Sequence, residues 1–385
     1  MKKVFYLKNI SELDYIKNLS SEMEIIISPK KLSRLGELTL EQANQALKYC
    51  HQNHVPAFLE WDVLMTENDF QQCLKSIKQI DLEHVSAIRV QDIGAYHYLL
   101  ANLSIDLHLI IESGNHNLVA IKKWEEVGKG KLKRFVLGLE LPKNVIAKYK
   151  AQLSTACELQ VLGKILLFYS PRSLLSRPMN STDESIKVSA SSEETPHKGF
   201  FVIENIHGTF MFLPKDQFLL DVFEEVKLTG VDSIRIDHRF LEGGFSLQEM
   251  ISLVENEDHE KWSSFKENYA NKLIRGYFNV NKSDAIFPKL KNYRTKKKTD
   301  NYIGKVVDVK KEQYLAISVF HHDTKKLAVG DKIEISSPDG KVKRIEVRSI
   351  RNIALESIQN VTKEKIILIP HVGGISVKAQ VHFLG

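Results

Sequence analysis

Charged and polar side chains recur directly after the short apolar runs of this sequence. Carboxylates beside arginines can bind a small anion or move protons between substrate atoms. The same groups can instead form ion pairs and helix caps that hold loops in place, and both interpretations stay open. On the first interpretation, the catalytic candidates are Asp92, Glu140, Asp237 and Arg239, and the substrate-binding candidates are Asp62, Glu112, Arg172 and His238.

A second candidate region is the stretch Leu166–Pro178, LLFYSPRSLLSRP. It begins apolar, turns at Ser170-Pro171 and continues with serines and arginines, which is typical of a site rather than a strand. A serine nucleophile needs a base beside it, and only His207 or His238 could come near. No HExxH pattern exists, so protease chemistry is a minor alternative.

The three cysteines, Cys50, Cys73 and Cys157, are odd in number and far apart. No CxxC or mixed Cys/His spacing is present, so neither a disulfide framework nor a metal site is expected. The histidines His51 and His54, and the pair His321-His322, are typical of a protein surface.

A basic strip follows residue 288, in the sequence KLKNYRTKKKTDN. It is either a solvated linker or a strip that contacts phosphates, with Tyr293 as a stacking platform. On the second interpretation, the nucleic-acid-binding residues are Lys291, Arg294, Lys296, Lys297 and Lys298.

Eight β-rich runs must position the candidates in the first part of the chain. They are mostly apolar without alternation, as expected for buried parallel strands. Helical patterns lie between them, among them Ser11–Ser20, which opens on a capping-box pattern at Ser11, and Lys215–Thr229. A doubly wound sheet is the alternative, but the count of eight favours an α/β fold of the (β/α)8 TIM-like barrel type. The predicted strands are Val4–Leu7, Met23–Ser28, Ala57–Asp62, Ser86–Gln91, Leu107–Glu112, Arg134–Gly138, Glu158–Gly163 and Asp232–Asp237.

Three regions make up the predicted domain organisation. Residues 1–258 form the barrel, with a long insertion at 164–214 after strand 7 whose Ser/Thr/Glu-rich middle is expected to be mobile. Residues 259–301 form a basic linker. Residues 302–385 consist of short strands between Gly- and Asp-containing turns, which predicts a small C-terminal antiparallel β-barrel.

Composition sets wide limits on function. Of 385 residues, 43% are apolar and 26% charged, and the net charge of +6 permits a polyanionic partner without requiring one. Because the N-terminus lacks a signal-peptide pattern and the longest apolar run is Ile165–Tyr169, we expect a cytoplasmic protein without a membrane partner.

Several short motifs occur in an order and spacing that point to one family. They are FLPKDQ…GVDSIRIDHR (Phe212–Arg239), VQDIG (Val90–Gly94), LEL (Leu139–Leu141), RGYF (Arg275–Phe278) and, near the end, Gly304 with the turn Val329–Asp331. Together they resemble the collagenase-like peptidase family, peptidase family U32, from about residue 31 onward. The resemblance implies that the C-terminal unit is translation-factor-like.

The resemblance also marks a departure from the family pattern. Members carry cysteines at the positions of Leu166 and Ser173 and at two later positions near residues 180–200, where this chain has none. In several members four such cysteines hold an iron–sulfur cluster, and studied members are linked to hydroxylation of RNA bases or quinone precursors. Since clusters need thiolates, no cofactor is expected here.

Two classes of function follow from the resemblance. In the first, the chain is a cluster-less companion or divergent member of the RNA (tRNA/rRNA) base-hydroxylation branch. It would bind RNA, with tRNA the leading candidate, or form a hetero-oligomer with a cysteine-bearing family member. In the second, it is an enzyme, either a collagenase-like peptidase or a barrel enzyme acting on a small anionic substrate.

Overall fold

The computed structural model describes residues 1–17, 19–112, 117–128, 130–191, 199–279, 301–320, 326–337, 342–362 and 365–384. The chain divides into two compact units, Met1–Ile286 and Phe287–Gly385. Each unit has its own hydrophobic core and is described by itself.

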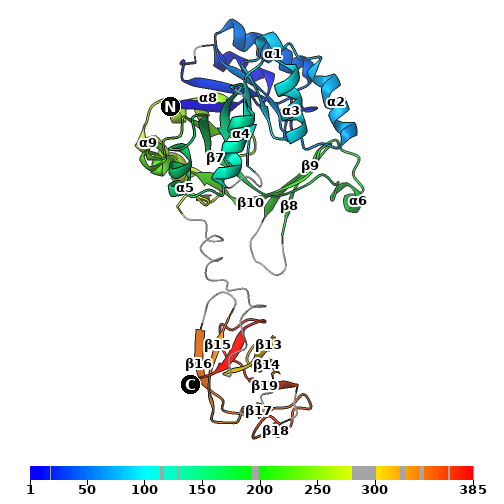
Figure 1. Ribbon diagram of the computed structural model, residues 1–385, viewed down its shortest axis with the longest axis vertical. Helices are drawn as coiled ribbons and strands as arrows, with labels where there is room; N and C mark the ends of the chain where they lie inside the picture. The colour runs from blue at the N-terminus through cyan, green and yellow to red at the C-terminus, as the bar shows by residue number, and fades with distance from the viewer. Residues whose placement is uncertain are drawn as a thin grey trace. The chain divides into compact units, whose positions relative to one another are not determined.

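Eight parallel strands close into a barrel in the first unit (Figure 1). Each strand pairs with its neighbour along the chain, and β11 closes the ring by pairing with both β7 and β1. The predicted TIM-like barrel and its eight strands are therefore confirmed. The strands are β1 (Lys2–Tyr6), β2 (Met23–Ile27), β3 (Ala57–Trp61), β4 (Ala87–Val90), β5 (Leu107–Ile110), β6 (Leu132–Val136), β7 (Ala156–Ser170) and β11 (Ser233–Ile236).

Helices follow the barrel strands, and capping side chains set the starts of α1, α2, α3, α4 and α8. Thr39, Thr66 and Ser246 each form a capping box with the residue three positions later, which satisfies free amides of the first turn. The helices are α1 (Leu40–Gln52), α2 (Glu67–Ile77), α3 (Ile93–Asn102), α4 (Leu118–Val127), α5 (Lys143–Lys150), α7 (Phe223–Leu228) and α8 (Leu247–Val254).

Three helical details differ from the sequence-based expectation. The first helix, expected over Ser11–Ser20, is the 3₁₀ helix η1 (Ile10–Ile16), capped by Asn9 rather than Ser11. The helix expected over Lys215–Thr229 begins as a strand, and only its second half is helical, as η3 (Leu220–Val222) and α7. Helix α3 was not predicted, because its apolar residues do not alternate with polar ones at helical spacing.

The insertion after strand 7 forms an antiparallel arm (Figure 1). Strand β7 continues past the barrel to Ser170 and pairs there with β10 (Gly208–Phe218). Strands β9 (Phe200–Asn205) and β8 (Ile186–Ala190) extend the same sheet, and α6 (Ser176–Met179) lies between β7 and β8. Residues 192–198 of the predicted mobile stretch lie outside the described residues.

The passage of β7 from barrel to arm depends on Gly163. Its φ of +150° belongs to a region that side chains rarely adopt. A Cβ there would lie 2.9 Å from Gln160 Nε2 and 3.1 Å from the Asp237 carbonyl oxygen. Only glycine therefore allows this close approach between β7 and the end of β11.

The segment that follows α8 packs onto the barrel. Helix α9 (His259–Asn268) lies within the predicted linker 259–301, but its Trp262 is buried and donates a hydrogen bond of 2.8 Å to the Leu253 carbonyl. Tyr269 donates a bond of 2.6 Å to Asp216 on β10. The short strand β12 (Leu273–Ile274) then pairs with β10, so this part of the chain belongs to the first unit.

The second unit is an antiparallel sheet of eight strands. The order is β16-β15-β20-β13-β14-β19-β17-β18, and in the described residues no pairing joins the two ends, so the sheet is a half-barrel. Its strands are β13 (Tyr302–Lys310), β14 (Tyr314–Val319), β15 (Lys332–Ser336), β16 (Val342–Glu346), β17 (Ile350–Arg351), β18 (Ser357–Ile358), β19 (Ile366–Pro370) and β20 (Gln380–Phe383).

Candidate active site at the barrel mouth

The inside of the barrel is charged, although most barrels of this type are filled by branched apolar side chains. Arg89 on β4 donates two hydrogen bonds of 2.7 and 2.8 Å to Glu158 on β7. Arg134 on β6 donates to Glu24 on β2 at 2.7 and 3.1 Å and to Glu158 at 3.3 Å. Arg235 on β11 lies 3.7 Å from Glu158. These residues are buried, so their charges are compensated inside the protein.

The electrostatic environment fixes the charge of each group. Burial opposes ionisation of Glu158, but Arg89, Arg235 and Arg134 outweigh it and lower the pKa of its carboxyl group strongly. Burial, together with Arg134 and Arg89, lowers the pKa of the buried His108 well below its ordinary value, so that this ring is neutral at pH 7.

A second layer of polar groups lies nearer the carboxyl ends of the strands. Glu60 accepts hydrogen bonds from the hydroxyls of Tyr6, Ser28 and Ser33 at 2.7–2.8 Å. Arg239 donates to Asp237 at 2.8 and 2.9 Å, and its guanidinium lies 3.4 Å from the centroid of the Tyr6 ring. Each of these groups is therefore held by several partners.

A cavity of about 440 Å³ opens above this layer, at the carboxyl ends of the strands where barrel enzymes carry their active sites. The arm supplies one wall of the cavity, because β7 continues upward beside it. Its polar groups are Arg34, Glu112, Glu140 and the rings of Tyr169 and Tyr277. The apolar lining consists of Leu64, Leu139, Ile165, Leu166, Leu167, Phe168 and Leu213.

Arg34 is a cationic side chain of this cavity that no sequence motif indicated. It lies between β2 and α1, where its backbone amide and its Nε donate to the two carboxylate oxygens of Asp62 at 2.7 and 3.0 Å. This pairing outweighs the burial of Asp62 and lowers the pKa of its carboxyl group. The Arg34 guanidinium carbon is 5.7 Å from the centroid of the Tyr169 ring. The only sequence signal was an arginine shortly after a predicted strand.

The structure gathers only part of the predicted site. Glu112 and Glu140 line the cavity, and Glu112 pairs with Arg235. Asp62, Asp237 and Arg239 lie at the strand ends as members of ion pairs, so they position neighbours rather than line the cavity.

Three other predicted residues have different surroundings. Asp92 caps α3 by accepting a hydrogen bond of 2.9 Å from the Ala95 amide. Arg172 is exposed in the turn after β7. His238 is fully buried, with its Nε2 3.6 Å from Glu12. The predicted nucleic-acid-binding residues Lys291, Arg294, Lys296, Lys297 and Lys298 lie outside the described residues.

The cysteines do not form a reactive or cluster-binding set. Cys50, Cys73 and Cys157 are buried on α1, α2 and β7. Burial raises the pKa of the Cys50 and Cys157 thiols to about 12 and that of Cys73 to about 11, so all three are protonated at neutral pH. Leu166, at one position where the resemblance implies a cluster ligand, lines the cavity, and it offers no donor atom. The side chains present therefore do not fit a thiolate-bound iron–sulfur cluster.

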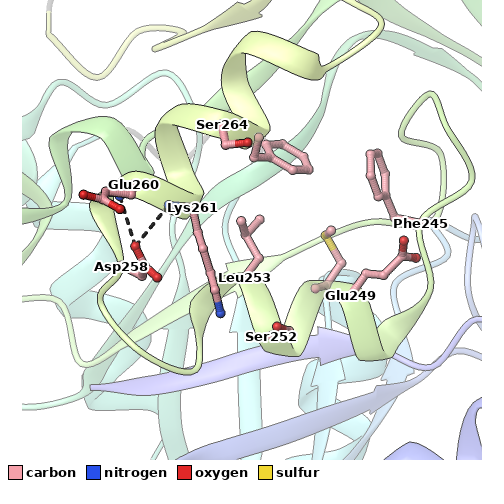
Figure 2. A pocket seen from close by; sticks show the side chains of 10 residues that line it. Phe245, Glu249, Ser252, Leu253, Asp258, Glu260, Lys261 and Ser264 are labelled. Carbon is pink, nitrogen blue, oxygen red and sulfur yellow. Dashed lines mark hydrogen bonds between the residues drawn. The ribbon is translucent and has the colours of Figure 1, made fainter.

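A second cavity, of about 500 Å³, lies among the side chains of α8 and α9 (Figure 2). Two of its acidic groups, Asp258 and Glu249, already cap helices. Asp258 accepts from the Glu260 and Lys261 amides at 3.0 Å, and Glu249 completes the capping box of α8. We therefore assign the candidate site to the barrel mouth.

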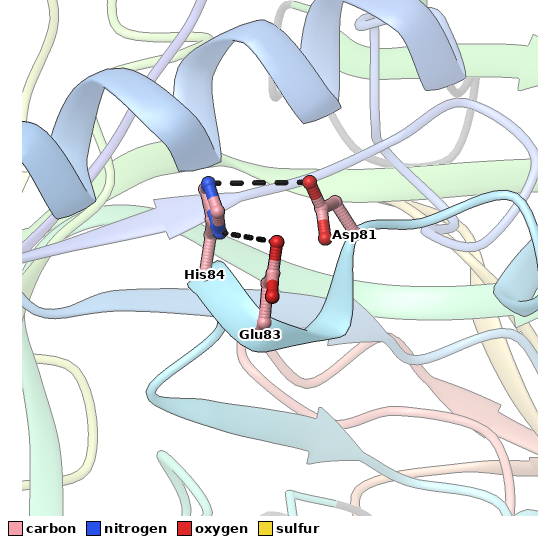
Figure 3. A group of neighbouring side chains, drawn as sticks. All are labelled: Asp81, Glu83 and His84. Atoms are coloured by element: carbon pink, nitrogen blue, oxygen red, sulfur yellow. Dashed lines mark ion pairs between the residues drawn. The ribbon is translucent and has the colours of Figure 1, made fainter.

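Asp81, Glu83 and His84 form a surface group whose potential metal-ligand atoms lie within 4.8 Å of one another (Figure 3). Both carboxylates are exposed, and they face opposite nitrogens of the His84 ring, at 3.9 Å for Asp81 and 3.8 Å for Glu83. One ion could therefore not bind both carboxylates and one ring nitrogen in this arrangement.

Comparison with known proteins identifies relatives. The model of the family described as peptidase family U32 matches residues 31–270. The tRNA hydroxylation protein P2 of Bacillus subtilis is 26% identical over 144 residues, and the match covers 34% of this chain and 45% of that protein. An uncharacterized protease of Methanocaldococcus jannaschii is 23% identical over 323 residues, covering 77% of this chain and 76% of that protein.

Similarity also extends to solved structures. The U32 peptidase Mk0906 matches with a TM-score of 0.40 and 9% identity, covering 62% of this chain and 92% of that one.

Among the residues that the structure describes, no helix combines the length and hydrophobicity that a membrane span requires.

Proposed function

Because the chain belongs to peptidase family U32, we propose that it acts on RNA, as a cluster-less companion or divergent member of the branch that hydroxylates tRNA bases. The relative named tRNA hydroxylation protein P2 supports this choice within the family, although it matches over less than half of its length. The proposal assigns RNA binding to the C-terminal unit and base recognition to the barrel mouth.

The division of charge between the two units carries the proposal. Residues 287–385 contain 20 Lys and Arg against 10 Asp and Glu, a net charge of +10. Residues 1–286 contain 34 Lys and Arg against 38 Asp and Glu, a net charge of −4. A concentrated positive charge is the electrostatic feature that phosphate backbones recognise. Exposed members in the described part of this unit are Lys305, Lys310, Lys311, Lys326, Lys332, Lys343, Arg344, Arg348, Arg351, Lys365 and Lys378.

The absence of a fitting thiolate set shapes the role that we propose. A chain that cannot hold the cluster would bind and present the RNA while a cysteine-bearing family member supplies the oxidation chemistry. A hetero-oligomer with such a relative is therefore part of the proposal. Co-purification of this partner from the native cell tests this part, and its absence from an RNA-bound fraction would favour a protein that acts alone.

The second candidate is a barrel enzyme that acts on a small substrate, and the cavity beside Arg34 and Glu112 favours it. A small-molecule enzyme has no need of a strongly basic second unit. Binding of tRNA therefore separates the two candidates.

The direct test measures tRNA affinity of the full-length chain from 50 to 300 mM salt. We expect affinity to fall as salt rises, because each neutralised phosphate releases counterions. Replacing Lys296, Lys297 and Lys298 by glutamine should weaken binding and reduce the slope of log affinity against log salt by roughly 2 to 3. The matched control replaces the exposed barrel residues Lys48, Lys78 and Lys123 by glutamine and should leave both quantities unchanged. Salt-insensitive binding, or none at 50 mM salt, would contradict the proposal.

A further inference from the structure

The guanidinium of Arg34 carries two donors for which the described part of the chain offers no acceptor. The side chain is only 8% exposed, and its Nε and backbone amide both bind Asp62. No described residue accepts a hydrogen bond from Nη1 or Nη2, and Arg34 lines the cavity at the barrel mouth. Neither atom is among the fully buried unpaired atoms, so both are reached from the cavity, where they can donate to an acceptor on a ligand.

The loop that carries Arg34 is fixed from several sides, which makes its guanidinium a preorganised group. Ser33 is bonded to Glu60 at 2.7 Å, and the Leu32 carbonyl accepts from the Asp62 amide at 3.2 Å. The Arg34 carbonyl accepts from Asn205 on β9 at 2.8 Å. A donor held in this way loses little entropy when a ligand binds.

We propose that Arg34 recognises a carbonyl oxygen of an uncharged, planar ligand group, and that Asp62 is the positioning residue that aims it. Among the described residues, the other charged groups on the cavity wall are the carboxylates of Glu140 and of Glu112, which pairs with Arg235, so Arg34 is the one cation of the described lining. The nearby Tyr169 ring and the leucines suit a flat ring with a largely apolar body. The inference rests on the proposed function, in which this ring is a nucleobase of the bound RNA.

The geometry separates a carbonyl from a phosphate. Arg34 already shares its charge with Asp62, so the pair is neutral, and what remains at Nη1 and Nη2 is hydrogen-bond donation. A neutral oxygen needs only this donation. A phosphate would bring a full negative charge to a wall whose described residues offer no cation other than Arg34.

The experiment titrates the full-length chain with each of the four ribonucleosides and, separately, with inorganic phosphate. Methyl NMR signals of the cavity leucines, such as Leu166 and Leu213, report occupancy. The variants are Arg34→Met, Arg34→Lys, Asp62→Asn and the charge-neutral pair Arg34→Met with Asp62→Asn, which avoids leaving Asp62 buried alone. Arg177→Met, on the exposed face of α6, is the control.

We expect at least one ribonucleoside to shift these signals. Arg34→Met should weaken the affinity for this ribonucleoside about tenfold or more, the loss typical of a missing charged hydrogen bond. Asp62→Asn should weaken binding less, and the double variant no more than Arg34→Met alone, since Asp62 acts through Arg34. Arg34→Lys should change the order of preference among the nucleosides, because lysine lacks the planar fork. Arg177→Met should bind as the wild type does.

Three results would overturn the inference: unchanged affinity in Arg34→Met, failure of all four ribonucleosides to occupy the wild-type cavity, or phosphate that competes with a bound ribonucleoside. These are distinguishable from failure of the proposed function. If ribonucleosides bind through Arg34 while tRNA does not bind the chain, the RNA role fails and the Arg34 assignment stands. If tRNA binds with its salt dependence while Arg34→Met has no effect, only the inference fails.

Discussion

Arg89 and Glu158 lie opposite each other inside the barrel and are joined by two hydrogen bonds of 2.7 and 2.8 Å, with both side chains fully buried. Strand β4 carries one residue and β7 the other, so the pair spans the interior rather than joining neighbouring strands. Their consequence for stability is direct, because removal of one charge leaves the other buried without compensation.

Replacing Arg89 by methionine should lower the free energy of unfolding by about 3–5 kcal/mol, the cost of breaking a buried ion pair. Urea unfolding of the barrel, followed by tryptophan fluorescence, measures this loss. The comparison variant is Lys123→Met, whose ion pair with Glu126 is exposed and should change stability by less than about 1 kcal/mol. Equal effects of the two substitutions would contradict the role of the buried pair.

Acid should destabilise the barrel. The folded-state pKa values of Glu158, Asp62 and Asp237 are lowered by their arginine partners, so these carboxyls bind protons more readily when unfolded. Their stabilisation is present above the unfolded values of about 4 and is lost as pH falls below them. Urea midpoints at pH 7, 5, 4 and 3 should decrease, most steeply below pH 5. A midpoint that stays constant to pH 3 would be incompatible with this account.

His108 should add a separate dependence at higher pH. Its folded-state pKa is lowered, so the unfolded chain takes up a proton near pH 6.5 that the folded chain does not. The free energy of unfolding therefore falls as pH decreases through about 6.5. His108→Gln should reduce this slope between pH 7 and 5.5, as measured by urea unfolding at each pH. An unaltered slope would show that other groups cause it.

Gly163→Ala should destabilise the barrel unit by about 1–3 kcal/mol, because the new Cβ meets Gln160 and Asp237 at a backbone geometry that alanine avoids. Gly373→Ala, at a position with open space and an ordinary φ, is the matched control and should stay within about 0.5 kcal/mol. Thermal unfolding of each variant provides the measurement. A neutral Gly163→Ala would mean that β7 can shift.

Substitutions of Asp92 test whether this residue belongs to the functional site or only caps helix α3. Asp92→Ala should cost about 1 kcal/mol through loss of the α3 cap, whereas Asp92→Ser, which can cap equally well, should restore stability. Neither variant should change tRNA or ribonucleoside affinity. If Asp92→Ser keeps the stability of the wild type but loses affinity for tRNA or a ribonucleoside, Asp92 has a role in the functional site.

The barrel could be predicted because its strands are runs of Ile, Leu and Val between helix caps. The charged interior could not be predicted, because the strands were identified from their apolar residues alone. Seven of the eight strands carry a buried charged residue or histidine, and these residues meet only when the barrel closes. They are Glu24, Glu60, Arg89, His108, Arg134, Glu158 and Arg235.

The candidate site shows the same limit. A charged residue after a strand can cap the next helix, as Asp92 does, or enter the cavity, as Glu112 does, and the local sequence does not separate these outcomes. Arg34 lacked any motif, because its role depends on Asp62 in the next loop. The arm was missed because polar, serine-rich strands resemble a loop when their pairing partner is distant in sequence.

Strand β7 contributes both to the charged interior of the barrel and to the wall of the cavity. Glu158 near its start holds the charged interior together, and Leu166–Tyr169 near its end form the cavity wall. Gly163 lies between these two parts of β7, where the strand passes from the barrel to the arm. Substitutions in β7 that reshape the cavity are therefore expected to change the free energy of unfolding of the barrel as well. Ligand preference and stability should then change together.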